Sequence, residues 1–183
     1  LVRVESSERI RIGRALDAGA IGVMIPRIKT PEQVSAVVKH MSYPPFGDRG
    51  VATYNRSAKW GRDLSGLTQK AKAACIIQIE TLKALENVEA IAAIDGADLL
   101  FVGPLDLSFA LGVPRDFKNP VFIEACVKVI AAAKANNKVA GILAADAAAA
   151  SAYIELGFKF IAIGSDATLL AGAITNLVTQ LKK

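Results

Sequence analysis

The sequence is poor in several residue types on which common structural classes depend. Its 183 residues include two cysteines, one histidine and one tryptophan. Cys75 and Cys126 lie far apart in the chain, so they indicate neither a CxxC metal-binding pair nor a disulfide framework. Reduced thiols in a cytoplasmic protein are therefore expected.

Long apolar runs and a signal segment are also missing. The longest apolar stretches fall short of the roughly 18 to 20 residues that cross a bilayer. Residues 1–15 carry charges throughout, which is unlike a secretory signal. The sequence therefore predicts no membrane segment. Because the chain begins with Leu1 rather than Met, we expect the natural protein to extend upstream of it.

The net charge of +5 does not indicate nucleic-acid binding. Such binding depends on clustered lysines and arginines, whereas here the basic residues are scattered, and no aromatic residues interleave with them in a stacking pattern. We interpret the charge as a solvated basic surface and expect no nucleic-acid partner.

What the sequence does contain is a regular alternation of short apolar runs and longer amphipathic segments, which is typical of parallel β/α units. Because the runs are almost continuously apolar, they should be buried on both faces, as strands between layers of helices are. The six runs are LVRV (1–4), IGVMIP (21–26), CIIQIE (75–80), LLFVG (99–103), VAGIL (139–143) and FIAIG (160–164).

Helix signals support this division. Thr30, Pro31 and Gln33 form a capping-box pattern that predicts a helix over residues 31–40. Between residues 41 and 66 the alternation breaks into a stretch rich in proline and glycine. Loops of this length are uncommon unless they serve function or assembly, so we interpret it as a functional or interface loop.

Six β/α units do not close a barrel. A complete (β/α)8 TIM barrel has eight units and about 250 residues, so the shortfall of about 67 residues corresponds to roughly two units. We therefore predict a single α/β domain over residues 1–183, a TIM barrel that lacks its first two units. A doubly wound open sheet is the alternative, but the glycine-rich turn expected after its first strand is absent.

Two carboxylates follow neighbouring predicted strands. Glu80 ends one apolar run, and Asp106 lies three residues past the next. The carboxyl ends of the strands form the active-site face of barrels, and oxygen ligands suit Mg²⁺ or Mn²⁺. Carboxylates also favour helix N-termini for structural reasons. On spacing alone, a metal site and a pair of capping or surface acids are both compatible with these positions.

Four motifs in the same order along almost the whole chain resemble the HpcH/HpaI aldolase family. They are RALDAGAIGVMIP (14–26), YPPFGDRG (43–50), QIET (78–81) and GPLDLS (103–108). The resemblance implies a (β/α)8 barrel that assembles as a homohexamer, with the last helix exchanged between subunits. It also implies a metal-dependent carbon–carbon lyase that cleaves a 4-hydroxy-2-oxo acid into pyruvate and an aldehyde.

The resemblance assigns roles to residues by position. Glu80 and Asp106 match the two ligands of a divalent metal ion, Mg²⁺ or Mn²⁺, with Co²⁺ as a further candidate. Gln78 matches a residue that contacts the pyruvate carboxylate or its water. Leu105 and Asp106 match positions whose backbone N–H groups hold that carboxylate. Arg3 matches the arginine that stabilises the enolate oxygen.

The resemblance also implies a catalytic histidine, which in this family comes from the first part of the barrel and so should lie upstream of Leu1. Asp17 matches an aspartate that supports this histidine, although a structural acid at a helix end fits its position almost as well. His40, the only histidine here, should instead interact with the C-terminal dipole of its helix. No lysine lies in the six apolar runs, which argues against a Schiff-base mechanism.

Two alternatives stay open. A CoA-ester lyase of the citramalyl or malyl type also holds Mg²⁺ with two carboxylates, although the QIET and GPLDLS contexts argue against it. A catalytically silent fragment or assembly subunit is the other, because a barrel without two strands exposes open strand edges. Little exchange of the pyruvate methyl protons is expected from residues 1–183 alone, and clear exchange from a complete gene product.

Overall fold

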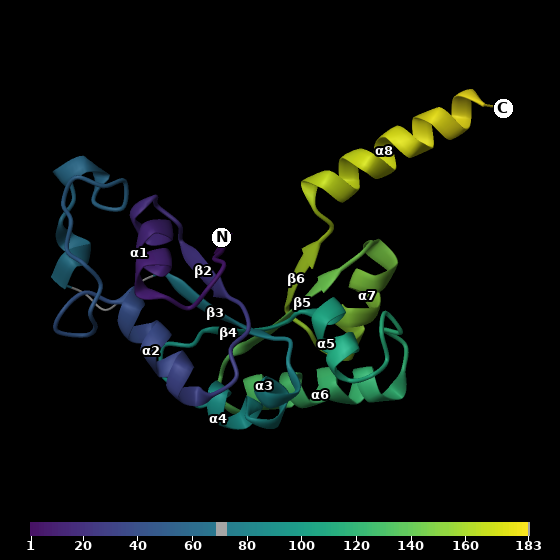
Figure 1. Ribbon diagram of the computed structural model, residues 1–183, viewed down its shortest axis with the longest axis horizontal. Coiled ribbons are helices and arrows are strands. Elements are labelled where there is room, and N and C mark those ends of the chain that lie inside the picture. The colour runs from purple at the N-terminus through teal and green to yellow at the C-terminus, as the bar shows by residue number, and fades with distance from the viewer. Residues whose placement is uncertain (69–72, 183) are drawn as a thin grey trace.

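Each of the six apolar runs forms a strand in the computed structural model, which describes residues 1–68 and 73–182. All neighbouring strands pair in parallel, in the order β1-β2-β3-β4-β5-β6, and the sheet is curled (Figure 1). The prediction of six parallel strands is confirmed. The strands are β1 (Val2–Arg3), β2 (Gly22–Ile25), β3 (Ala74–Ile79), β4 (Leu99–Val102), β5 (Val139–Ala144) and β6 (Phe160–Ile163).

The helices between the strands cover the outer face of the sheet. The capping box predicted at Thr30 is present: its side chain accepts from the backbone N–H of Gln33, whose own side chain accepts from the Thr30 N–H. The helices are α1 (Arg9–Asp17), α2 (Pro31–Met41), α3 (Leu82–Glu86), α4 (Val88–Ala92), α5 (Pro104–Ala110), α6 (Pro120–Ala135), α7 (Ala147–Leu156) and α8 (Asp166–Leu181).

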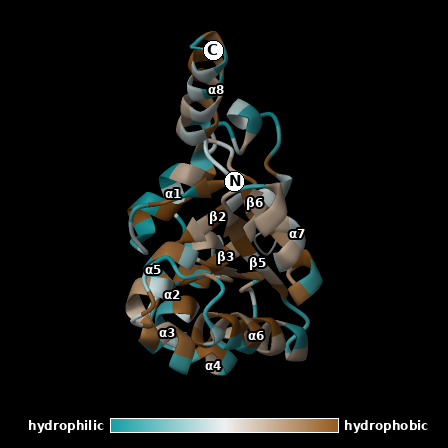
Figure 2. Cartoon of the chain, turned by 90° about the vertical axis from the view of Figure 1, so that its right-hand side faces the viewer, coloured by the Kyte–Doolittle hydropathy of each residue, from teal (hydrophilic) through white to brown (hydrophobic). Residues whose placement is uncertain are grey.

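The two faces of the sheet have different surroundings because successive side chains of a strand point to opposite faces. Ile77 and Ile79 of β3 belong to the large core between sheet and helices. Ile76 belongs to a smaller cluster on the inner face, with Leu99 and Phe101. Figure 2 shows the hydrophobic strands at the centre and the helices around them. The central strands β3 and β4 are thus largely buried on both sides, as their apolar composition predicts. The same prediction is wrong for β1, which is exposed, and for β6, which is only partly buried, because these two strands are the edges of the sheet.

The predicted long loop after α2 is irregular, with two 3₁₀ turns at Lys59–Gly61 and Ser65–Thr68. It is attached to the end of α1, where Arg49 lies on the ring of Tyr43, 4.5 Å from the ring centroid, and pairs with Asp17. Polar contacts therefore hold the start of the loop against α1, while most of its described residues are exposed.

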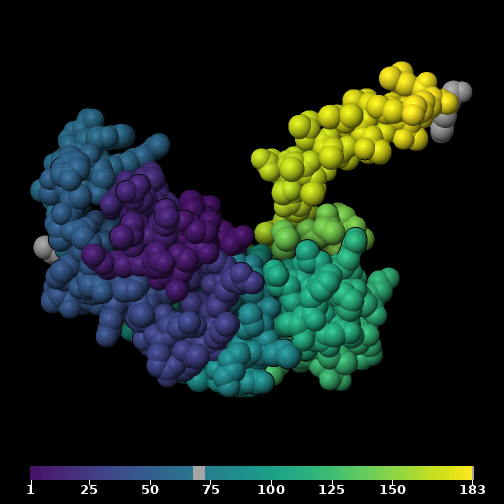
Figure 3. Space-filling view, in the orientation of Figure 1, coloured from purple at the N-terminus to yellow at the C-terminus, as the bar shows by residue number. Residues whose placement is uncertain are grey.

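Helix α8 projects away from the rest of the molecule (Figures 1 and 3). It begins with a capping box in which Ser165 accepts from the Thr168 N–H, and none of its residues is buried. Its exposed side chains include several leucines. No helix among the described residues is both long and apolar enough to cross a membrane.

Candidate active site

The candidate site lies at the carboxyl ends of β3 and β4, which pair through Ile79 and Val102. Glu80 directly follows β3, and Gly103 directly follows β4 and donates its N–H to the Ile79 carbonyl at 3.2 Å. Helix α5 starts one residue later, with Asp106 in its first turn. The parallel register therefore brings the two predicted metal ligands to the same edge of the sheet.

The inner face of the sheet also carries the other predicted polar residues. In β3, Ile76 lies in the inner cluster, so Gln78 and then Glu80 follow it on the same face at a spacing of two. Arg3 of β1 is in register with Met24, which packs against that cluster. Paired residues of neighbouring strands point to the same side, so Arg3 faces the same interior as the two β3 residues.

Glu80 is buried, with 6% of its surface exposed, and its environment is charged. Burial raises the pKa of its carboxyl group, and the nearby Asp106 carboxylate raises it further. The hydrogen bond from the Arg27 backbone N–H and the charges of Arg3 and Arg27 act in the opposite direction, but the net pKa shift is upward. Glu80, Asp106 and two arginines thus lie within electrostatic reach of one another.

Gly103 makes this arrangement sterically possible. A Cβ atom at this position would lie 2.7 Å from Glu80 Oε2 and 3.0 Å from Gln78 Nε2. The glycine has an ordinary φ of −85°, so it is needed for space and not for an unusual backbone conformation. The Glu80 carboxylate and the Gln78 amide therefore both lie against the backbone at the end of β4.

The first turn of α5 is exposed at Leu105 and Asp106 but held from beneath. Ser108 is fully buried, donates its hydroxyl to the Leu105 carbonyl at 2.7 Å and accepts from the Arg115 N–H at 3.0 Å. The backbone N–H groups of a first helical turn have no partner within the helix and favour anions. This turn can therefore present N–H groups to a carboxylate, as predicted for Leu105 and Asp106.

The donor set suits a hard divalent cation. Two carboxylates would supply oxygen ligands and leave positions for water and substrate. The Gln78 Oε1 atom is buried without a hydrogen-bond partner, which fits a group that interacts with a bound ligand or its water. No group of three or more His, Cys, Asp or Glu side chains that could hold a metal occurs in the described ranges. Substrate or water would thus complete the coordination.

Asp17, the remaining predicted catalytic residue, lies elsewhere. It ends α1, which returns to the amino ends of the strands, and its carboxylate accepts a 2.6 Å hydrogen bond from Arg49. The structure therefore does not bring Asp17 to Glu80 within one chain. It shows a structural partner for Asp17, and the supporting catalytic role stays a prediction.

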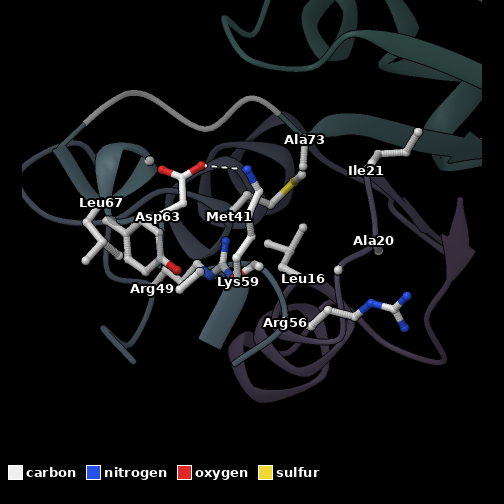
Figure 4. Close-up of a pocket in the computed structure, with 15 residues that line it drawn as sticks. Leu16, Ala20, Ile21, Met41, Arg49, Arg56, Lys59, Asp63, Leu67 and Ala73 are labelled. Carbon is white, nitrogen blue, oxygen red and sulfur yellow. Dashed lines mark hydrogen bonds and ion pairs between the residues drawn. The ribbon is translucent and has the colours of Figure 1, made fainter. Parts of the chain in front are cut away.

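A cavity of about 410 Å³ lies at these amino ends, between α1 and the long loop (Figure 4). Its walls include Arg49 and the ion pair of Lys59 with Asp63, and it reaches Ile21 and Ala73, the residues just before β2 and β3. It lies at the opposite end of the strands from Glu80 and Asp106, and neither carboxylate lines it. The candidate site is therefore identified from the chemistry of its residues and not from a cavity.

His40 is near the end of α2, and its Nδ1 atom lies 2.8 Å from Asp48 Oδ1. Its position in the last turn, predicted from the sequence, is confirmed. The interaction with Asp48 is an additional local contact, and it keeps the ring on the helix end rather than at the carboxyl ends of the strands.

Two residues of the site were missed from the sequence. Gly103 carried a usable signal, since a glycine between a strand and an N1 proline marks a tight approach of backbone to neighbouring groups. Arg27, whose N–H binds Glu80 Oε1 at 2.7 Å, has a positive φ of 58°. Arginine is not a residue type that signals this conformation, so nothing in the local sequence pointed to it.

Comparison with known proteins identifies a family for the chain. The sequence profile of the HpcH/HpaI aldolase/citrate lyase family matches residues 1–173. A 2-keto-3-deoxy-L-rhamnonate aldolase of Salmonella paratyphi A is 38% identical over 187 aligned positions, which cover 100% of this chain and 69% of that protein.

Solved structures give the same result. A HpcH/HpaI aldolase/citrate lyase family protein from Burkholderia cenocepacia J2315 superposes with a TM-score of 0.93 at 38% identity, covering 100% of this chain and 73% of that one. The HpcH/HpaI aldolase from Desulfitobacterium hafniense DCB-2 superposes with a TM-score of 0.90 at 30% identity, covering 100% and 72%. The six-stranded sheet is thus the corresponding part of that barrel-like fold.

Proposed function

Because the chain belongs to the HpcH/HpaI aldolase/citrate lyase family, we propose that it reversibly cleaves a 4-hydroxy-2-oxo acid into pyruvate and an aldehyde. The observation that carries the proposal is the placement of Glu80 and Asp106 at paired strand ends, on a face that also carries Arg3 and Gln78. The two carboxylates would hold a cation, and the arginine would place positive charge beside the 2-oxo acid.

The cation proposed for Glu80 and Asp106 is Mg²⁺ or Mn²⁺, with Co²⁺ as a further candidate, because both ligands are hard oxygen donors. A bound cation would supply Lewis acidity toward the oxygens of the 2-oxo acid. Divalent-metal dependence is typical of this family, and the choice among these metals belongs to the proposal.

The chain's own residues would orient the substrate. Arg3 places fixed positive charge where the keto oxygen becomes negative during carbon–carbon cleavage, which is electrostatic preorganisation. The first-turn N–H groups at Leu105 and Asp106 would hold the carboxylate of the 2-oxo acid. Gln78, with its unpaired Oε1 atom, would bind that carboxylate or a water beside it.

A 2-keto-3-deoxy sugar acid is the first substrate to test, since relatives at 38% identity are named for cleavage of 2-keto-3-deoxy-L-rhamnonate. Such an acid combines the 2-oxo acid group that the site is proposed to bind with the 4-hydroxyl group that aldol cleavage requires. Glu80 and Asp106 do not specify the aldehyde half of the substrate. Measuring cleavage of sugar acids with different aldehyde halves would identify it.

We further propose that the protein assembles as a homohexamer in the cytoplasm, with α8 exchanged between subunits. The support for exchange is that α8 extends from the body (Figure 3) and has no buried residue. It also carries an apolar stripe of exposed side chains, Leu170, Ile174, Leu177 and Leu181. The support for a reducing compartment is that both cysteines are free and buried.

The test uses the protein with any segment that precedes Leu1 in place. NMR in D₂O monitors the metal-dependent exchange of the pyruvate methyl protons. Glu80→Gln and Asp106→Asn should each lower the exchange rate by about 100-fold or more, since a metal's charge stabilisation amounts to several kcal/mol. Glu155→Gln changes an exposed acid on α7 and is the matched control. Exchange that continues unchanged in both site variants would contradict the proposal.

A further inference from the structure

Arg27 occupies an unusual position next to the candidate metal ligand. It lies two residues past the end of β2, and its φ of 58° is in the left-handed region, which residues with a side chain seldom adopt. In this conformation its backbone N–H donates to Glu80 Oε1 at 2.7 Å. The Arg27 side chain itself is exposed.

The segment around Arg27 is held in place on both sides. Ile28, the next residue, is 1% exposed and belongs to the core between sheet and helices. The Lys29 carbonyl accepts a 2.8 Å hydrogen bond from Asn87 of the following β/α unit, and Thr30 caps α2. The left-handed conformation is thus fixed by contacts other than the one with Glu80, as expected where backbone strain serves a function.

The hydrogen bond from the Arg27 N–H makes the two oxygens of the Glu80 carboxylate inequivalent. Oε1 accepts from the Arg27 N–H, whereas Oε2 lies 2.7 Å from the place that a Cβ of Gly103 would occupy. Gly103 is the N-cap residue of α5, whose first turn carries Asp106. A carboxylate whose one oxygen is tied to backbone cannot rotate freely. Its other oxygen then has a defined direction, which is how residues around a metal site orient its ligands.

We propose that Arg27 is a positioning residue for Glu80, acting through its left-handed backbone N–H and not through its guanidinium group, so that Oε2 is the oxygen offered to a divalent cation. The inference rests on the proposed metal-dependent function and adds the means by which β2 orients a ligand carried by β3. Because the segment is fixed in advance, no rearrangement of Glu80 is needed when the cation binds.

Three substitutions distinguish the role of the Arg27 backbone from the role of its side chain. Arg27→Gln removes the positive charge but keeps a side chain of similar reach. Arg27→Gly removes the whole side chain and favours the left-handed conformation. Arg27→Val keeps the backbone N–H group but places a β-branched residue where φ is positive, which that residue type resists most strongly. Mn²⁺ affinity is measured by EPR titration of the folded protein, with any segment that precedes Leu1 in place, and thermal midpoints are recorded in parallel.

We expect Arg27→Val to weaken Mn²⁺ binding by about 10-fold or more, while Arg27→Gln and Arg27→Gly stay within about twofold of the wild type. A role in loop stability alone would lower the thermal midpoint of the valine variant and leave its Mn²⁺ affinity unchanged. That result would overturn the inference, and so would equal losses of affinity in all three variants, which would point to the guanidinium group.

The wild type and Glu80→Gln distinguish this inference from the proposed function. If the wild type binds Mn²⁺ and Glu80→Gln does not, the metal site stands, and normal binding by Arg27→Val then rejects the positioning role alone. If the wild type itself does not bind Mn²⁺ in the presence of pyruvate, the metal-dependent function and the positioning role fail together.

Discussion

Among single residues, Glu80 combines burial with an unfavourable charge. The pKa of its carboxyl group is raised, first by burial and also by Asp106. In the metal-free protein the ionised form is therefore less favourable in the folded state than in the unfolded chain. This free-energy cost of folding is fully present above the raised pKa and disappears below the ordinary pKa of glutamate, about 4.3.

We accordingly predict that Glu80→Gln stabilises the metal-free protein at neutral pH. The difference in free energy of unfolding between variant and wild type should shrink as the pH falls through the raised pKa, because the wild-type carboxyl then becomes neutral. Urea denaturation in EDTA at several pH values measures it, with Glu155→Gln as the exposed control. A destabilised variant at neutral pH, or a difference independent of pH, would contradict the assignment.

Gly103 is a second residue whose effect can be predicted from local geometry. In Gly103→Ala the new methyl group would lie 2.7 Å from Glu80 Oε2. Either the carboxylate moves or the strand end shifts, at a cost of about 1–3 kcal/mol in stability. We expect loss of pyruvate proton exchange together with a lower thermal midpoint. Gly50→Ala, where a Cβ meets no atom within 4 Å, is the control and should leave both unchanged.

The candidate residues differ in how far the sequence could predict them. Glu80 and Asp106 were predictable because strand ends can be recognised from apolar runs, and parallel strands place those ends at one edge. Arg27 was not predictable, since the segment that carries its positive φ is held by the burial of Ile28 and by the hydrogen bond from Asn87 to the Lys29 carbonyl, which form only in the fold. Asp17 ends α1 at the opposite ends of the strands, where Arg49 is its partner, and its supporting catalytic role stays a prediction.

At the scale of elements, the positions of the strands and of the capped helices could be predicted from local sequence signals. The helix predicted over residues 31–40 is observed as α2, Pro31–Met41, because its capping box acts within four residues. The conformation of the long loop was not predictable. It depends on Arg49, whose partner Asp17 lies 32 positions away in the sequence, and no local pattern announces such a pair.

Helix α8 carries an apolar stripe at spacings that place its members on one side of the helix. The stripe comprises Leu170, Ile174, Leu177 and Leu181, all exposed. We predict that Ile174→Glu combined with Leu177→Glu lowers the oligomeric state, because burial of each such side chain contributes about 1.5–3 kcal/mol. Light scattering coupled to size-exclusion chromatography measures the mass.

The matched control for this helix is Thr179→Glu, which adds a charge to the side opposite the stripe. It should leave the molecular mass at the wild-type value. If the double stripe variant and the control both keep the wild-type mass, α8 is not an assembly element, and the proposed exchange of this helix between subunits is wrong.

For the whole molecule, the order and register of the strands bring the site together. Arg3, Glu80 and Asp106 come from three different β/α units, and only the curled parallel sheet places them on one face. The number of strands and their parallel pairing could be predicted from the alternation of the sequence. Which side chains face inward required the register, because a shift by one residue reverses every side chain of a strand.

The most direct test of the account is the position of the bound cation. A crystal structure of the protein with Mn²⁺ and pyruvate, with anomalous scattering recorded for manganese, should show a peak between the carboxylates of Glu80 and Asp106. Each should lie about 2.0–2.2 Å from the ion, as for small divalent cations held by oxygen. A manganese peak elsewhere, with pyruvate bound away from these two residues, would contradict the central claim.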